Sequence, residues 1–458
     1  MPTAVEDLRG QVRGTVIGPE DPGYEQARKV HNGMIDRRPA GIVGCAGVDD
    51  VVAALAWARE QGLDVAVRGG GHSAPGFGTT DGGLVIDLSP LNDVQVDPDG
   101  RTARVGGGCT WGQFNEAAHE FGLATTGGVI STTGVSGLTL GGGIGYLARG
   151  FGLACDNMIS AELVTADGRT LTASGDENPE LLWALRGGGG NFGIVTSFQF
   201  RLHPVGEIYG GPIVYPIDRT ADVLTFFDQF IAGAPREMGG FSAVALAPPL
   251  PFIPEEYHLK PVALVVACWA GDASQGEAAV RPLVEAAPVV GSFLGPMPYP
   301  AINKMFDELL PAGLRSYWKS NFLREISEQQ LAVHLEYGPK VPTVQSAVHF
   351  YPINGAVHDV GLDESAFPSR DARYGPVFSA FWEDPAQDEA NIRWVRDYVA
   401  ALAPFVEEGG YINFMSGDDQ DRIKTNYGGA YERLAHVKRT YDPDNVFHLN
   451  QNIMPAQV

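Results

Sequence analysis

Hydrophobic and polar positions follow helical and strand periods in turn between residues 41 and 203. Apolar residues at helical spacing, with aspartates in the first turn, predict a helix over 48–60, and a second helix over 111–122 ends at Gly122. Strands are predicted at 64–69, 84–88 and 193–202, and hairpins at 94–105 and 162–174. This region is therefore predicted to be a mixed module of helices and strands.

The pattern changes between residues 206 and 404. Helical runs over 218–231 and 389–402 alternate with apolar strands at 262–269, 346–351 and 376–382. A last helix is predicted over 431–441. Since 458 residues exceed what one hydrophobic core usually organises, we expect two or more domains.

Composition and charge exclude several classes of function. A formal net charge of −23 argues against binding to nucleic acid or an anionic membrane, because both require a basic surface. The N-terminus lacks a signal-peptide pattern, and no apolar run is long enough to cross a bilayer. The four cysteines form no CxxC pair and no metal-binding motif is present, so we expect no metal and a cytoplasmic location.

Many of the 59 glycines fall in three segments, 67–76, 127–152 and 186–195. In the first, Arg68, three glycines and His72 predict a ligand loop, because successive glycines leave backbone N–H groups uncovered for phosphate oxygens. A tight turn between two strands is the alternative. The second segment is too long for a turn and interleaves apolar residues, which favours backbone packed against a large flat ligand.

The third segment contains G-x-G-x-x-G at residues 188–193, but in reversed context. A dinucleotide-binding fingerprint follows a strand and opens a helix, whereas this one follows a helical pattern and precedes a strand. We therefore reject a Rossmann fold. P-loop, zincin and nucleophile-elbow motifs are also missing from the sequence.

Together, several segments resemble the FAD-linked oxidases of the berberine bridge enzyme type, within the vanillyl-alcohol oxidase superfamily. They are VRGGGHS at 67–73, GFGLACDN at 150–157, and the segments 181–204 and 431–453. The resemblance implies an α+β fold, with a PCMH-type FAD-binding domain of two α/β subdomains and an α+β substrate domain whose antiparallel sheet covers the flavin. The domains would span 1–205, with a core of about 37–205, then 206–404, and 405–458 returning to the FAD domain.

The resemblance also implies which residues hold the cofactor. His72 would be bonded through an imidazole nitrogen to the flavin 8α-methyl; a loop histidine beside non-covalent FAD is the alternative. Gly134 aligns with the cysteine that forms a second link in many relatives, so we expect a single covalent link and a structural thiol at Cys155. The predicted FAD contacts are Arg68, Gly69, Gly70, Gly71, His72, Ser73, Gly76, Gly128, Val129, Thr133, Gly134, Gly137, Leu138, Gly142, Gly143, Gly145, Val195, Asn413 and Asn450.

For catalysis, the resemblance places residues 411–414, YINF, on a strand beside the isoalloxazine. Tyr411 is the candidate base, although the family's second tyrosine is Phe414 here, and a packed aromatic role is the alternative. Asn413 would hydrogen-bond the flavin or its surroundings. The candidate pocket residues, each with a structural role as the alternative, are Tyr317, Lys319, His349 and Tyr351.

The resulting hypothesis is an FAD-dependent oxidase. Hydride would pass from a small alcohol, amine or secondary metabolite to the covalent flavin, and dioxygen would reoxidise it to give hydrogen peroxide. The expected partners are a small-molecule substrate and dioxygen, with a homodimer left open. The alternatives are a same-fold dehydrogenase with another acceptor, a flavin oxygenase, a flavin carrier without turnover, and a protein without cofactor.

Overall fold

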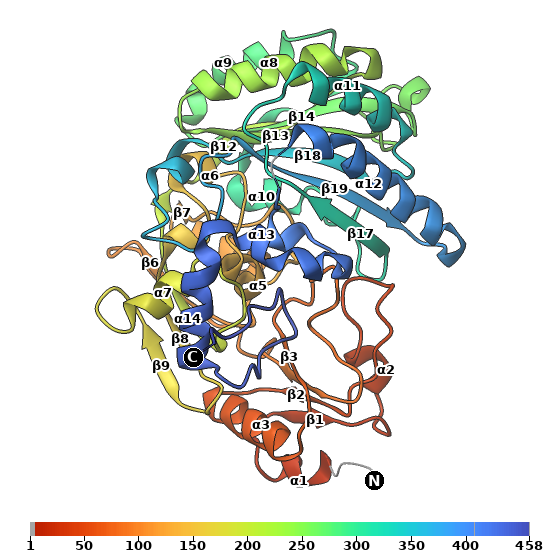
Figure 1. The fold of residues 1–458 in the computed structure, drawn as a ribbon. Helices are drawn as coiled ribbons and strands as arrows, with labels where there is room; N and C mark the ends of the chain where they lie inside the picture. Colours follow the sequence, from red (N-terminus) through yellow and green to blue (C-terminus); the bar gives the residue numbers. More distant parts are fainter. Residues whose placement is uncertain (1–4, 407, 458) are drawn as a thin grey trace.

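The computed structural model describes residues 5–406 and 408–457 as two stacked halves (Figure 1). Two small sheets and short helices form the lower half, and an eight-stranded sheet covered on its upper side by helices forms the other. The mixed helix-and-sheet architecture expected from the sequence is therefore confirmed. In the described ranges, no helix is long and apolar enough to cross a membrane.

The lower half contains two main sheets. Their strands are β1 (Thr15–Ile17), β2 (Gly41–Gly44), β3 (Val65–Arg68), β4 (Leu84–Asp87), β5 (Val94–Asp97), β6 (Thr102–Gly106), β8 (Met158–Val164), β9 (Thr170–Ala173) and β10 (Ile194–Arg201). The first sheet has the order β1-β2-β4-β3 and the second β5-β6-β10-β8-β9. Strands β2, β4 and β3 are parallel, whereas the second sheet is antiparallel. A short pair joins β7 (Leu123–Ala124) to β11 (His203–Pro204).

The helices of the lower half are short. They are α1 (Val5–Arg9), α2 (Tyr24–Ala27), α3 (Val48–Glu60), α4 (Trp111–His119), α5 (Val135–Leu140), α6 (Ala148–Phe151) and α7 (Pro179–Leu185). Helix α4 begins with a capping box, in which the Thr110 hydroxyl accepts from the Gln113 amide and the Gln113 side chain bonds the Thr110 amide. Gly122 follows this helix with φ +67°, a left-handed backbone conformation that glycine adopts without steric cost. The predicted helices and hairpins of this half are confirmed.

The upper half is one antiparallel sheet with helices on its outer face, except for α10 (Tyr299–Lys304), which lies below the sheet and contacts α4 of the lower half (Figure 1). Its strands are β12 (Glu207–Pro216), β13 (Met238–Leu246), β14 (Pro261–Trp269), β15 (Gly291–Ser292), β16 (Gly295–Pro298), β17 (Arg315–Ser320), β18 (Ala347–Pro352) and β19 (Tyr374–Trp382). The helices are α8 (Thr220–Gly233), α9 (Gly276–Val284), α10 (Tyr299–Lys304), α11 (Glu328–Tyr337) and α12 (Asp388–Leu402). The main path runs β15-β12-β14-β13-β18-β19-β17, and β16 also pairs with β12.

Alternate residues of the central strands belong to two different hydrophobic clusters, one on each face of the sheet. Val348 and Phe350 of β18 and Phe378 of β19 belong to the core beneath the helices. The residues next to them on the same strands, such as Tyr351 and Val377, belong to a different cluster, which is shared with the lower half. Successive strand residues point to opposite faces, so the lower face of the sheet is directed at the lower half.

The end of the chain returns to the lower half. Helix α14 (Tyr431–Tyr441), preceded by α13 (Ile423–Tyr427), contacts α7 there. On α14, the fully buried Lys438 ammonium donates to Asp442 at 2.6 Å and to the carbonyl oxygens of Asn191 and Phe447 at 2.9 Å. Three partners compensate for the lost hydration of this ammonium group. This bonded lysine fixes the C-terminal segment to the loop that contains Asn191.

Candidate FAD site

A deep cavity lies between the two halves, and its two walls differ. The wall from the lower half, here called the glycine wall, consists mainly of residues 68–74, 128–138 and 189–195. The opposite wall, here called the aromatic wall, comes from the lower face of the large sheet and neighbouring segments. Its aromatic members are Phe241, Phe306, Trp318, His349, Tyr351 and Phe381.

The centre of the glycine wall is a row of free backbone amides. The N–H groups of Gly69 to Ser73 donate no hydrogen bond to any part of the chain that the structure describes. All five residues are half-buried, and backbone donors removed from water are rarely left without a partner. Successive free amides form a nest that suits phosphate oxygens. Beside them, the Arg68 guanidinium pairs with Asp87 at 2.6 Å and donates to the Ala27 carbonyl oxygen at 2.8 Å.

Two glycines bring the wall's backbones into direct contact. A Cβ on Gly70 would lie 2.3 Å from the Gly134 nitrogen, and a Cβ on Gly134 would lie 2.3 Å from the Gly70 nitrogen. No side chain, cysteine included, fits at position 134 unless this backbone moves. The resemblance aligns Gly134 with a cysteine that links the flavin in many relatives. In this chain the backbone of Gly70 occupies the space that such a side chain would need.

His72 ends the amide row with a neutral imidazole. Its Nε2 lies 3.1 Å from the Thr132 hydroxyl and its Nδ1 3.4 Å from the Thr133 hydroxyl. The ring stacks on His31 with the centroids 4.0 Å apart. Burial, with a smaller contribution from His31, lowers the pKa of His72 to about 3. A neutral imidazole keeps a nitrogen lone pair, which is the requirement for a nucleophile.

Tyr411 is on the cavity wall but not on a strand. Residues Ile412–Phe414 form a 3-10 turn closed by the hydrogen bond from the Phe414 amide to the Tyr411 carbonyl, so the expected strand at 411–414 is wrong. The Tyr411 hydroxyl accepts from the Gly143 amide and from Asn413 Nδ2, both at 2.7 Å. Both lone pairs are thus occupied, and burial raises the pKa of the phenol.

The structure brings most of the predicted site residues together. Those that line the cavity are Arg68, Gly69, Gly70, Gly71, His72, Ser73, Gly128, Val129, Thr133, Gly134, Gly137, Leu138, Val195, His349, Tyr351, Tyr411, Asn413 and Asn450. Asn450 Oδ1 is buried and has no hydrogen-bond partner in the described residues. An unpaired acceptor of this kind is available to a ligand.

Four predicted glycine contacts lie outside the lining and pack against protein instead. Gly76 forms a turn, and a Cβ on it would meet Ile35 at 2.7 Å. Gly142 faces Phe367, and Gly143 donates its amide to Tyr411. A Cβ on Gly145 would lie 1.6 Å from the Gly127 carbonyl oxygen. These glycines allow close packing behind the wall.

Two predicted pocket residues, Tyr317 and Lys319, also lie outside the lining. The Tyr317 hydroxyl donates to Asp418 at 2.6 Å, and the Lys319 ammonium binds Asp418 at 3.0 Å. Burial opposes ionisation of Asp418, but the hydrogen bonds from Tyr317, Lys319 and Arg396 lower its pKa to about 2. The residue between them, Trp318, lines the cavity. Alternation along β17 would predict Trp318 as a lining residue only if it were known which face of the strand meets the cavity.

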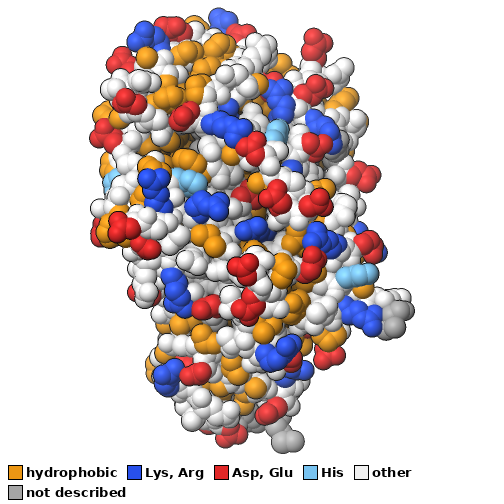
Figure 2. Space-filling view, turned by 90° about the vertical axis from the view of Figure 1, so that its left-hand side faces the viewer, with side chains coloured by type: hydrophobic (Ala, Val, Ile, Leu, Met, Phe, Trp, Pro, Cys, Tyr) orange, Lys and Arg blue, Asp and Glu red, His pale blue; other side chains and the backbone are white. Residues whose placement is uncertain are grey.

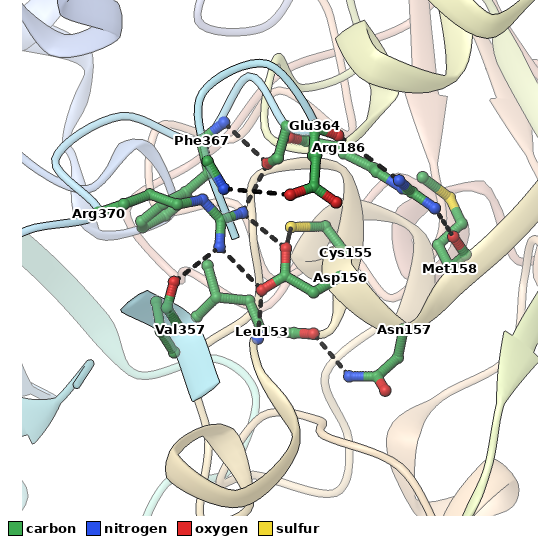
Figure 3. Close-up of polar contacts among 12 residues, drawn as sticks. Leu153, Cys155, Asp156, Asn157, Met158, Arg186, Val357, Glu364, Phe367 and Arg370 are labelled. Carbon is green, nitrogen blue, oxygen red and sulfur yellow. Dashed lines mark hydrogen bonds and ion pairs between the residues drawn. The ribbon is translucent and has the colours of Figure 1, made fainter. Parts of the chain in front are cut away.

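A buried ion pair joins the two halves (Figure 3). Arg370, from the segment between β18 and β19, donates to both carboxylate oxygens of Asp156 at 2.6 and 2.9 Å, and both side chains are about 5% exposed. Cys155 Sγ lies 3.5 Å from Asp156, and burial raises the pKa of its thiol, as expected for a structural cysteine. Phe367, under the Arg370 guanidinium, contacts the Tyr411 ring edge-on.

A second buried arginine also joins the two halves. Arg149, on α6, donates from Nε to Asn354 Oδ1 at 2.7 Å. Its remaining nitrogens donate to the carbonyl oxygens of Ala234, Pro235 and Met238. Because each of these acceptors belongs to the upper half, the guanidinium links the two halves through several hydrogen bonds, which are stronger with a charged donor.

The residues present fit FAD. The free amides suit its phosphates, the contact of Gly70 with Gly134 admits no side chain, and the neutral His72 stands at the end of the row. All four cysteines are buried and free, and none lines the cavity. A bound FAD would therefore meet one nucleophile of this kind in the glycine wall, namely His72.

Comparison with known proteins agrees with this geometry. The family described as "FAD binding domain" matches residues 39–174, and the one described as "Berberine and berberine like" matches residues 410–454. An FAD-linked oxidoreductase of Dictyostelium discoideum is 32% identical over 460 residues, covering 99% of this chain and 97% of that protein. (R)-6-hydroxynicotine oxidase of Paenarthrobacter nicotinovorans is 30% identical over 462 residues, covering 97% of each.

Solved structures show the same fold. 6-Hydroxy-D-nicotine oxidase from Arthrobacter nicotinovorans superposes with a TM-score of 0.85 at 28% identity, covering 97% of this chain and 98% of that one. Xylooligosaccharide oxidase from Myceliophthora thermophila has a TM-score of 0.86 at 24% identity, covering 99% and 100%, and supports the fold alone. With the free amides, His72 and the two-walled cavity, these matches show that the chain belongs to the FAD-linked oxidoreductases of the berberine bridge enzyme-like family.

Proposed function

We propose that this protein is an oxidase whose FAD is bonded to His72 alone. The strongest support is the row of free amides from Gly69 to Ser73, which contains an uncharged imidazole in a cavity without a cysteine. Thr132 and Thr133 orient the ring through their hydroxyl groups. An imidazole held by such contacts keeps one orientation toward the cofactor, which favours attachment at a single atom.

We further propose that residues 1–205 and 405–458 form the FAD domain, and residues 206–404 the substrate domain. The amides of Gly69–Ser73 would bind the phosphates, while Asn413 and Asn450 would face polar groups of the cofactor. Bound FAD would accept hydride from a substrate C–H bond. The aromatic wall would hold the substrate over the flavin and exclude water.

The substrate would be a small alcohol, amine or secondary metabolite, and dioxygen the electron acceptor that yields hydrogen peroxide. A small-molecule partner suits the cavity between the two halves. Acidic and basic side chains are interspersed over the face shown in Figure 2, which is unlike the basic surface that nucleic acid requires. The free and buried cysteines support the further proposal of a cytoplasmic location.

Anaerobic flavin reduction tests the oxidase proposal. The purified protein is mixed without dioxygen with alcohols, amines and sugars, and loss of the oxidised-flavin absorbance near 450 nm, roughly where bound flavins absorb, is followed by stopped flow. We expect at least one class to bleach the flavin, and air to restore the colour with one hydrogen peroxide per flavin. Bleaching without recovery in air would support a dehydrogenase, and a flavin that no compound bleaches would support a carrier.

A further inference from the structure

The aromatic wall carries almost no charge. Among the described residues that line the cavity there is no aspartate, glutamate or lysine. The one arginine, Arg68, lies in the glycine wall and is neutralised by Asp87 at 2.6 Å. A cationic amine would find no counter-ion here, and a carboxylate would find no free cation. Desolvating an unpaired charge is costly, so the cavity disfavours charged substrates.

Two polar rings lie on one strand of this surface. Its other polar groups are Gln345, the Trp318 Nε1, and the hydroxyls of Ser346 and Ser379, which donate to the carbonyl oxygens of Phe381 and Ala347. His349 and Tyr351 occupy alternate positions of β18 and so face the cavity together, with ring centroids 5.6 Å apart. Phe241 packs edge-on against His349 at 5.2 Å, and Phe414 lies 5.9 Å from Tyr351. Phe414 belongs to the same turn as Tyr411, so the pair stands next to the segment that bounds the cofactor side.

Neither side chain has a hydrogen-bond partner among the described residues. No hydrogen bond to either imidazole nitrogen of His349 or to the Tyr351 hydroxyl is formed by the described residues, and His349 Nδ1 is buried. The cavity therefore meets His349 through Nε2. Burial lowers the pKa of His349 to about 4 and raises the pKa of Tyr351, so the imidazole is an acceptor and the phenol a donor at neutral pH. Tyr411 has no comparable free lone pair.

We propose that the cavity takes an uncharged aromatic alcohol, whose hydroxyl oxygen accepts a hydrogen bond from Tyr351 and whose hydroxyl proton passes to His349 Nε2. This inference rests on the proposed oxidase function. In the reaction the substrate C–H bond breaks, and hydride leaves with its electron pair for FAD. The O–H bond also breaks, the proton binds His349, and the carbon–oxygen bond becomes double. The positive charge gained by His349 would be offset by the negative charge that the hydride brings to FAD. His349 then releases the proton to solvent.

A matched substrate panel tests the substrate class. Anaerobic reduction rates are compared for 4-methoxybenzyl alcohol, the cationic 4-methoxybenzylamine, and cellobiose. We expect the alcohol to reduce the flavin at least tenfold faster than either of the others. A faster rate with the amine or with cellobiose overturns the inference while the oxidase function stands. If none of them, nor any other compound, reduces the flavin, the oxidase function fails and the inference with it.

Variants test the two side chains. For His349→Gln, which keeps a polar group but cannot take up a proton, we expect the reduction rate by 4-methoxybenzyl alcohol to fall about 100-fold or more, as for loss of a general base. Binding of the alcohol, measured by quenching of tryptophan fluorescence, should change less than about threefold. Tyr351→Phe should weaken binding and slow reduction about tenfold. The control, His358→Gln, alters an exposed histidine outside the lining and should match the wild type.

The pH profile separates proton transfer from a structural role. The groups around His349 are Tyr351 on its own strand, Phe241 on β13 and Val377 on β19, while His72 and Tyr411 lie across the cavity. In the wild type the reduction rate should stay level from pH 8 to about 5 and fall toward about 4, because protonated His349 cannot accept. The His349→Gln variant should lack this fall. An unchanged rate and profile in this variant would overturn the assignment of His349.

Discussion

The two walls of the cavity recognise their ligands by different means. The glycine wall presents backbone: five successive amides, Gly69 to Ser73, and a direct contact between Gly70 and Gly134. The aromatic wall presents side chains from alternate positions of sheet strands, among them the polar rings of His349 and Tyr351. A wall of backbone tolerates little change in its own residues. A wall of side chains can change specificity while its fold stays the same, because strand residues facing the cavity are replaceable one by one.

The largest expected effect comes from adding one methyl group to the glycine wall. In Gly70→Ala the new Cβ would meet the Gly134 backbone at 2.3 Å, so the amide row must shift. We expect loss of most bound flavin, measured by the ratio of flavin absorbance to protein absorbance after gel filtration. Gly175→Ala is the matched control, because a Cβ there meets nothing within 4 Å. Full flavin content in Gly70→Ala would contradict the backbone character of this wall.

The ion pair that joins the halves bearing the two walls should also be sensitive to substitution. In Arg370→Met the Asp156 carboxylate loses its buried partner, and we expect the free energy of unfolding to fall by about 3–5 kcal/mol. Chemical denaturation followed by tryptophan fluorescence measures this. The double variant Arg370→Met with Asp156→Leu removes both charges and should recover much of the loss. If the double variant is as unstable as the single one, the unpaired charge of Asp156 is not the cause of the loss.

Acid should weaken the fold through buried neutral histidines. Burial lowers the pKa of His334 to about 3, below its ordinary value of about 6.5. The unfolded chain therefore takes up this proton first, and stability is lost as pH falls from about 6.5 toward about 3. By pH 5 the share of this histidine is on the order of 2 kcal/mol. Denaturation at several pH values should show a shallower acid slope for His334→Phe than for the wild type, and an equal slope would contradict this origin.

Among the variants of residues that line the cavity, the smallest effect on flavin reduction is expected in Tyr411→Phe. Because the Tyr411 hydroxyl accepts from Gly143 and Asn413 and has no lone pair left for a substrate proton, it should position the turn at 412–414. We expect the anaerobic reduction rate to fall less than tenfold and stability to fall by about 1–3 kcal/mol, as two buried donors lose their acceptor. A 100-fold slower reduction with unchanged binding would instead make Tyr411 the base.

Local signals predicted much of the fold. The helices over 48–60 and 111–122 and the Asp-Gly hairpins depend on caps, turns and periodicity within a few residues of each other. The amide row was also predictable, since three glycines between Arg68 and His72 have few other uses.

The sequence did not predict which face of each strand meets the cavity, or which distant segments pack together. A single strand does not reveal which of its faces meets the cavity. The sequence therefore predicts Tyr317 and Lys319 as pocket residues, whereas Trp318, between them, lines the cavity. Glycines that pack against protein, such as Gly145, have the same local pattern as those that meet a ligand. The turn at 412–414 replaces the expected strand because Tyr411 bonds Gly143, a residue 268 positions earlier in the chain.

Attachment of the cofactor tests the central claim most directly. The wild-type protein and His72→Ala are denatured in acid, separated from free flavin, and weighed intact by mass spectrometry. The account predicts one FAD on each wild-type polypeptide and none on His72→Ala, since no cysteine lines the cavity. A wild-type chain without FAD, or FAD retained on the variant, would contradict it.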